Sequence, residues 1–167
     1  MPRLEFEFTV NGTKVAVATE PRTTLADCLR QELRLTGTHL GCEHGVCGAC
    51  TILLNDEPAR ACITLAITLD GCEVRTLEGL KDDALMVVLK EAFHEKHGLQ
   101  CGFCTPGMLI SSHDLLRRKP QLEEEQIRIA MSGNLCRCTG YQGIVRSIKA
   151  AADKWAAKAA VGEEVRR

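Results

Sequence analysis

The stretch GCEHGVCGACT, residues 41–51, contains three cysteines and three glycines in eleven positions. Such a stretch is a poor helix or strand, because glycine favours turns and left-handed backbone. We expect a loop whose backbone wraps closely around a group that is bound by its thiols. A fourth cysteine, Cys62, lies twelve positions after Cys50, beyond a predicted strand and turn that can fold it back onto the loop.

The spacing of these cysteines indicates a metal centre. Cys42, Cys47 and Cys50 follow C-x4-C-x2-C, the spacing of plant-type ferredoxins that hold a 2Fe–2S cluster. Zinc and plain burial are the alternatives. Zinc sites usually pair their ligands in two short knuckles, and three ligands in one loop with a distant fourth fit that pattern poorly.

A second group of cysteines lies further along the chain. QCGFCTPG contains Cys101 and Cys104, and GNLCRCTGY contains Cys136 and Cys138. Both pairs precede predicted helix starts, where the helix dipole favours thiolates. C-x2-C with C-x-C is not the ferredoxin spacing, so an iron–sulfur cluster and a zinc ion both remain open on spacing alone.

The N-terminal half reads as a small sheet with one helix. Residues 4–10 alternate apolar and polar side chains, and Asn11-Gly12 predicts a hairpin turn to a return strand. The pattern predicts a helix from Thr23 or Thr24 to about Leu33, with Cys28 on its apolar face. Further strands are expected in the TILLN stretch (residues 51–55) and, after a turn at NDEP (residues 55–58), around residues 61–69 and 73–76.

The C-terminal half reads as all helical. Apolar periodicity and the positions of proline and glycine predict helices over residues 81–97, 105–119, 122–133 and 143–160. The last of these has an inner face made of Ile144, Ile148, Ala151, Ala152 and Trp155. We therefore expect a first domain over 1–77, a helical domain over 78–160 and a loose tail over 161–167.

Composition excludes several classes of protein. The net charge is −1 and no block of basic residues occurs, which argues against binding to nucleic acid. No apolar run approaches the roughly 20 residues that span a bilayer, so no membrane association is expected. The N-terminus has no apolar signal core, which favours the cytoplasm, where ten cysteines would stay reduced.

Three motifs in this order, GCEHGVCGACT, QCGFCTPGM and GNLCRCTGY, resemble the iron–sulfur subunit of the xanthine oxidase family of molybdenum hydroxylases. The resemblance covers nearly the whole chain. It is strongest to the small subunits of carbon monoxide dehydrogenase and 4-hydroxybenzoyl-CoA reductase. It implies an α+β fold, a β-grasp ferredoxin-like domain followed by a four-helix bundle, each with one 2Fe–2S cluster.

The resemblance also implies the ligands and the partners. It assigns the first cluster to Cys42, Cys47, Cys50 and Cys62, and the second to Cys101, Cys104, Cys136 and Cys138. It places Gln100 and Cys138 toward the pterin of a molybdenum cofactor on a large partner subunit. FAD is expected on a medium subunit, and the assembly is expected to be a dimer of heterotrimers. The chain would relay single electrons between the molybdenum cofactor and FAD. No catalytic site is expected within this chain.

The remaining candidates are interpreted as structural. Cys28 is expected in the core, and Cys72 has no partner at ligand spacing. His39 and His44 flank the first loop and are expected at the surface or just outside the ligands. His94, His97 and His113 are interpreted as helix-surface residues.

Two other functions are weighed against the relay. One is a free-standing two-cluster ferredoxin, and the other is a zinc-bound structural module. We further expect Met108, Leu109 and Ile110 to contribute to a partner surface, because successive helical residues point about 100° apart. Full burial of all three inside the helical half is the alternative.

Overall fold

A five-stranded sheet forms most of the N-terminal half. The computed structural model describes residues 2–164, with side chains through residue 158. The strands are β1 (Leu4–Val10), β2 (Thr13–Thr19), β3 (Thr51–Leu54), β4 (Glu57–Arg60) and β5 (Glu73–Arg75). Their order in the sheet is β2-β1-β5-β3-β4, with β1 and β5 parallel and the other neighbours antiparallel. The predicted hairpin is confirmed, with Leu4 opposite Thr19 and Val10 opposite Thr13.

One short helix lies against this sheet. α1 (Leu25–Asp27) begins at Thr24, whose side chain accepts a hydrogen bond from the Asp27 N–H, and continues as a wider π-helical turn over Cys28–Glu32. The helix expected to about Leu33 is therefore present. Leu25, Cys28 and Leu29 are fully buried in the core beneath the sheet.

Two details of the strand prediction are wrong. Residues 61–69 contain short 3₁₀ turns at Ala61–Ile63 and Ala66–Thr68 rather than a strand. β4 begins inside the expected NDEP turn and includes Pro58. Proline is tolerated there because β4 is an edge strand of the sheet, where a missing N–H breaks no ladder.

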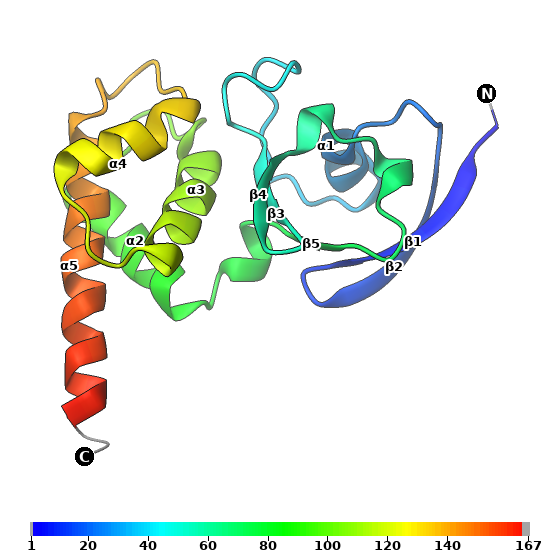
Figure 1. Cartoon of the computed structure of the whole chain (residues 1–167). Coiled ribbons are helices and arrows are strands. Elements are labelled where there is room, and N and C mark those ends of the chain that lie inside the picture. Colours follow the sequence, from blue (N-terminus) through cyan, green and yellow to red (C-terminus); the bar gives the residue numbers. More distant parts are fainter. Residues whose placement is uncertain (1, 165–167) are drawn as a thin grey trace.

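Within residues 2–164, four α-helices follow the sheet along the chain. They are α2 (Ala84–Glu95), α3 (Thr105–Arg118), α4 (Glu124–Ala130), which continues as a 3₁₀ turn over Met131–Gly133, and α5 (Gln142–Glu164). Figure 1 shows them together on one side of the molecule with the sheet on the other, and α5 running along the outer edge. α5 reaches Glu164, so it extends into the tail expected from residue 161, and residues 165–167 lie outside the described part.

β3 joins the two halves through its two faces. Successive residues of a strand point to opposite sides, and Ile52 packs in the core of the sheet half while Leu53 packs in the core of the helical half. α3 lies against β3 and β4 on one side and α2 on the other. The helical core therefore extends across the junction between the halves.

The burial of α3 corrects two expectations. Met108, Leu109 and Ile110 are exposed by only 0%, 4% and 1%, so the partner surface expected at these residues is wrong. Because α3 packs on both α2 and β3, all three directions around this turn face protein. His113 on the same helix is also buried rather than on the surface, and its Nε2 lies 3.0 Å from Asp83 Oδ1.

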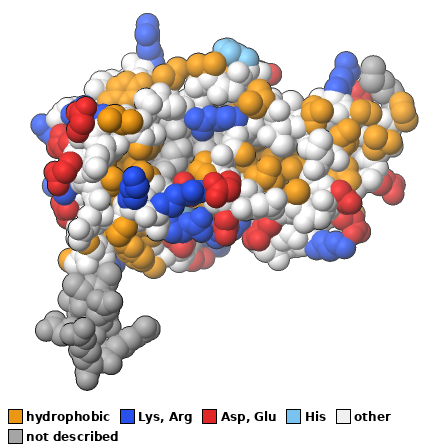
Figure 2. All heavy atoms as spheres, in the orientation of Figure 1, with side chains coloured by type: hydrophobic (Ala, Val, Ile, Leu, Met, Phe, Trp, Pro, Cys, Tyr) orange, Lys and Arg blue, Asp and Glu red, His pale blue; other side chains and the backbone are white. Residues whose placement is uncertain are grey.

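Charged side chains cross the junction at its solvent-facing edge. Figure 2 shows acidic and basic side chains side by side where the two halves meet. Arg118 Nη2 of α3 lies 2.5 Å from Glu57 Oε2 of β4, and Arg117 Nη2 donates to the Asp56 carbonyl over 3.1 Å. Such exposed pairs contribute little stability individually, so buried residues such as Leu53 link the halves more strongly.

Candidate metal centres

The first cysteine loop has the backbone that its glycines predict. Gly45 and Gly48 have φ of +85° and +75°, in the left-handed region that only glycine adopts without strain. Gly41 lies so close to the ligand loop that a Cβ there would stand 3.1 Å from Cys47 Sγ. The chain therefore curls tightly around its own thiols.

The electrostatics around these thiols differ from one cysteine to the next. Backbone N–H groups of His44 and Cys47 point at Cys42 Sγ, with the Cys47 N–H at 3.3 Å, and they lower the pKa of Cys42 to about 6. Burial, followed by a hydrogen bond with Cys50, raises the pKa of Cys62 to about 11. The Cys42 charge also acts on Cys62, so the structure brings Cys62 back to the loop as expected.

The second group of cysteines is also brought together. Cys104 lies beside Cys136 and Cys101 beside Cys138, although each pair is more than 30 positions apart in the chain. Burial, then the contact with Cys136, raises the pKa of Cys104 to about 12. The Phe103 N–H, 3.5 Å from Cys101 Sγ, lowers the pKa of Cys101.

Donors that the spacing did not reveal surround Cys136. The Thr139 hydroxyl donates to Cys136 Sγ over 3.1 Å and the Thr139 N–H over 3.4 Å. Burial alone would raise the pKa of Cys136, but these hydrogen bonds outweigh it and lower the pKa. The Cys136 N–H in turn donates to the Tyr141 hydroxyl over 3.0 Å, and Tyr141 itself has φ of +68°. Thr139 is the only small hydroxyl residue in the stretch CRCTGY, and the cysteine spacing alone does not mark it as a donor.

The thiol groups are suited to a cluster with more than one metal atom. All ten cysteines are free thiols. The thiols come in close pairs, and a 2Fe–2S cluster with four cysteine ligands has two of them on each iron. N–H groups aimed at sulfur suit the negative charge of such a cluster.

The other expected residues are placed as follows. Gln100 is exposed beside Cys101, and Cys138 is exposed as well. Cys28 is fully buried, so its expected place in the core is confirmed. Cys72 is half-buried against the core of the sheet half. His44 is exposed and His39 is half-buried, with its Nδ1 2.8 Å from the Phe103 carbonyl oxygen.

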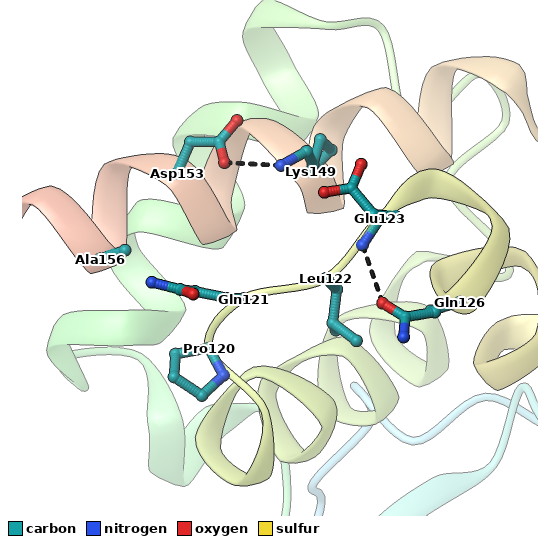
Figure 3. Close-up of a pocket in the computed structure, with 8 residues that line it drawn as sticks. All are labelled: Pro120, Gln121, Leu122, Glu123, Gln126, Lys149, Asp153 and Ala156. Atoms are coloured by element: carbon teal, nitrogen blue, oxygen red, sulfur yellow. Dashed lines mark hydrogen bonds and ion pairs between the residues drawn. The ribbon is translucent and has the colours of Figure 1, made fainter.

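No cysteine lines any of five surface hollows among the described residues. Figure 3 shows one of them, in which Lys149 and Asp153 of α5 face the segment from Pro120 to Gln126. Its lining includes no cysteine or histidine.

None of the helices within residues 2–164 has the length and apolar character needed to cross a bilayer.

Comparison with known proteins agrees with the thiol geometry. Residues 8–66 match the family described as 2Fe-2S iron-sulfur cluster binding domain, and residues 76–149 match the 2Fe-2S binding domain family. The chain is 55% identical over 144 residues to caffeine dehydrogenase subunit gamma of Pseudomonas sp. strain CBB1, covering 84% of this chain and 86% of the relative. It is 53% identical over 146 residues to the nicotine 6-hydroxylase small subunit of Paenarthrobacter nicotinovorans, covering 87% and 88%.

A solved structure shows the same fold. A chain of quinoline 2-oxidoreductase from Pseudomonas putida 86 superposes with a TM-score of 0.86 at 44% identity, covering 92% of this chain and 96% of that one. Nearly the whole length of both chains is therefore shared.

Proposed function

We propose the function of this chain from its family: it belongs to the iron–sulfur small subunits of the xanthine oxidase family of molybdenum hydroxylases. Its role is electron transfer within a multi-subunit oxidoreductase. The observation that carries this function is the presence of two groups of four cysteines, each gathered by its own half of the chain. When bound, 2Fe–2S clusters supply one-electron transfer.

The chain's own residues hold and tune these groups. The proposed ligands of the first cluster are Cys42, Cys47, Cys50 and Cys62, and those of the second are Cys101, Cys104, Cys136 and Cys138. When a cluster is bound, each close pair would share one of its irons, Cys50 and Cys62 in the first cluster and Cys104 and Cys136 in the second. The N–H and hydroxyl donors of Cys47, Phe103 and Thr139 stabilise the thiolate form at each site.

The architecture is proposed to be a β-grasp ferredoxin-like domain over 1–77 and a four-helix bundle over 78–160. Supporting this division, α5 packs on α2 and α4 while α2 packs on α3. Leu80, just beyond the proposed boundary, already belongs to the helical core.

The partners are proposed to be a large molybdopterin-binding subunit and a medium FAD-binding subunit, in a dimer of heterotrimers in the cytoplasm. Relatives whose names call them gamma or small subunits support a multi-subunit assembly. The ten reduced cysteines suit the cytoplasm. Gln100 and Cys138, both exposed, are proposed to face the pterin of the molybdenum cofactor.

The partner surface is proposed to surround the cysteine loops. Val46, Ile63, Phe103 and Leu135 are each next to a proposed ligand, and all four are exposed, by 49% to 61%. Large apolar side chains gathered around a redox site are typical of a surface that a partner covers. These residues replace Met108, Leu109 and Ile110 as the candidate surface.

Co-expression tests this function. The chain is produced together with a large molybdopterin-binding subunit and a medium FAD-binding subunit, and the assembly is isolated through a tag on this chain. We expect a stoichiometric complex that contains molybdenum, FAD and iron. A chain that purifies alone as a stable monomer with iron would contradict the subunit role and favour the free-standing ferredoxin, and a colourless chain with zinc would favour a structural module.

A further inference from the structure

One carbonyl group in the first cysteine loop is held from the other half of the molecule. The Gly48 carbonyl oxygen accepts hydrogen bonds from the Thr51 N–H at 3.2 Å and the Thr51 hydroxyl at 2.5 Å. It also accepts one from Asn134 Nδ2 at 3.1 Å, across 86 positions of the chain. Asn134 is exposed by only 3%, so this amide is a buried polar group whose hydrogen bonds are costly to lose.

Both ends of the Asn134 amide are engaged. Its Oδ1 accepts a hydrogen bond from the Ser111 hydroxyl of α3 at 2.9 Å. The amide therefore joins three segments: the first cysteine loop, α3 and the segment that leads to the second cysteine pair. Its orientation is fixed, because the oxygen has a donor in Ser111 and the nitrogen has an acceptor in Gly48.

The next residue adds a second link. The Leu135 N–H donates to the Cys47 carbonyl oxygen over 2.8 Å. Two consecutive residues, Asn134 and Leu135, therefore donate hydrogen bonds to the carbonyl groups of two consecutive residues of the first loop, Gly48 and Cys47. Cys47 is itself a proposed ligand of the first cluster, and Cys136, a proposed ligand of the second, follows Leu135 directly.

The packing leaves no slack around this contact. A Cβ at Gly48 would lie 2.6 Å from the Gly133 carbonyl oxygen, and a Cβ at Gly107 of α3 would lie 2.2 Å from the Gly48 carbonyl oxygen. Arg60 Nη2 of β4 also donates to the Gly133 carbonyl over 2.6 Å. Backbone meets backbone on both sides of Gly48, so a shift of one loop moves the other.

We propose that Asn134 is a positioning residue that fixes the separation and orientation of the two cysteine sites relative to each other. The proposal rests on the proposed function, because it concerns two clusters held by this chain. Among the described residues, Asn134 makes no hydrogen bond to a thiol, and it acts through the backbone of Gly48 and Cys47. Its loss is therefore expected to leave both ligand sets intact and to alter the geometry between them.

The test uses the full chain in its complex and two substitutions. Asn134→Asp keeps the shape but replaces the N–H donor by an acceptor facing the Gly48 carbonyl, and Asn134→Ala removes both hydrogen bonds. Asn11→Ala is the matched control, because Asn11 also bonds through both ends of its amide, to Thr76, and lies far from the cysteine loops in sequence and in contacts. Iron content, thermal stability and the EPR spectrum of the fully reduced protein are measured for each.

The magnetic interaction between two reduced clusters reports their mutual geometry. Wild-type protein should show splitting of its EPR signals at low temperature, and both Asn134 variants should show altered splitting with unchanged iron content. Exchange of the Leu135 amide hydrogen should accelerate by about tenfold in Asn134→Ala, as expected for the loss of a buried hydrogen bond. Asn11→Ala should lose stability yet keep the wild-type splitting.

The outcomes separate this inference from the proposed function. Wild-type splitting and wild-type amide exchange in both Asn134 variants would overturn the positioning role. Altered splitting in Asn11→Ala as well would also overturn it, because the effect would then follow from stability alone. Wild-type protein with fewer than two clusters would instead overturn the proposed function itself.

Discussion

At the residue scale, Cys28 is a cysteine whose surroundings remove its reactivity. It is fully buried, and burial, reinforced by the charge of Glu32, raises its pKa to about 11. Because the thiolate is the reactive and metal-binding form, Cys28→Ala should keep the full iron content and lose only about 1 kcal/mol of stability. Iron analysis and thermal unfolding check this, and loss of one cluster would contradict the core assignment.

His113 makes the stability of the helical half depend on pH. Burial lowers its pKa below 6.5, although Asp83 opposes the shift, and Arg117 and Arg75 add to the lowering. The unfolded chain therefore binds a proton more readily than the folded one, so this residue destabilises the fold as pH falls below about 6.5.

The corresponding experiment compares His113→Gln with wild type. Glutamine can still donate a hydrogen bond to Asp83 but does not titrate. Melting temperatures are measured from pH 7.5 to 5.5, with absorbance confirming that the iron stays bound. The variant should lose less stability than wild type over this range. Equal losses in the two proteins would show that another group titrates.

Gln100 is the residue at which the proposed partner contact can be separated from ligation. Gln100 is exposed and directly precedes Cys101, and its side chain has no thiolate that could bind iron. Gln100→Ala should therefore keep all the iron while turnover of the assembled enzyme falls or molybdenum cofactor is lost. Turnover and metal content of the purified complex are the measurements. Normal values of both would remove Gln100 from the proposed site.

At the element scale, the start of α3 depends on the absence of one side chain. Alanine usually stabilises a helix relative to glycine by up to about 1 kcal/mol. At Gly107 the new Cβ would instead lie 2.2 Å from the Gly48 carbonyl oxygen, which belongs to rigid backbone. Gly107→Ala should thus destabilise the chain by roughly 2–3 kcal/mol, as overpacking does.

Gly140→Ala is the comparison for this change. Gly140 has φ of +63° but open space around its Cβ position, so it reports backbone strain without a clash. Denaturant unfolding measures the free energy of unfolding of both variants and of wild type. A Gly107→Ala chain as stable as wild type would show that α3 can move away from the first cysteine loop.

Periodic elements were the predictable part of the fold. The hairpin of β1 and β2 follows from strict alternation and Asn11-Gly12, and the helices follow from apolar spacing and their start signals. β4 and the turns over 61–69 could not be predicted, because their conformation depends on the sheet edge and on the return of Cys62 to the first cysteine loop. The sequence of α3 did not reveal that the helix is buried, because its second packing partner, β3, lies more than 50 residues earlier in the chain.

At the scale of the whole molecule, cysteine spacing predicted which thiols lie together but not the residues that support them. The structure brings Cys62 to Cys50, Cys104 to Cys136 and Cys101 to Cys138, and their assignment as metal ligands stays a prediction. The contacts of Asn134 with Gly48 and of His39 with Phe103 join residues 86 and 64 positions apart. No local pattern encodes such contacts, because each residue alone resembles an ordinary loop polar group.

The central claim is that this chain carries two independent 2Fe–2S clusters on two separate sets of cysteines. EPR spectroscopy of the dithionite-reduced chain, combined with iron and zinc analysis, tests it most directly on wild type, Cys47→Ser and Cys136→Ser. We expect about four iron atoms per wild-type chain and two distinct signals. Cys47→Ser should abolish one signal and Cys136→Ser the other. A single signal in wild type, loss of both signals from either change, or stoichiometric zinc would contradict the account.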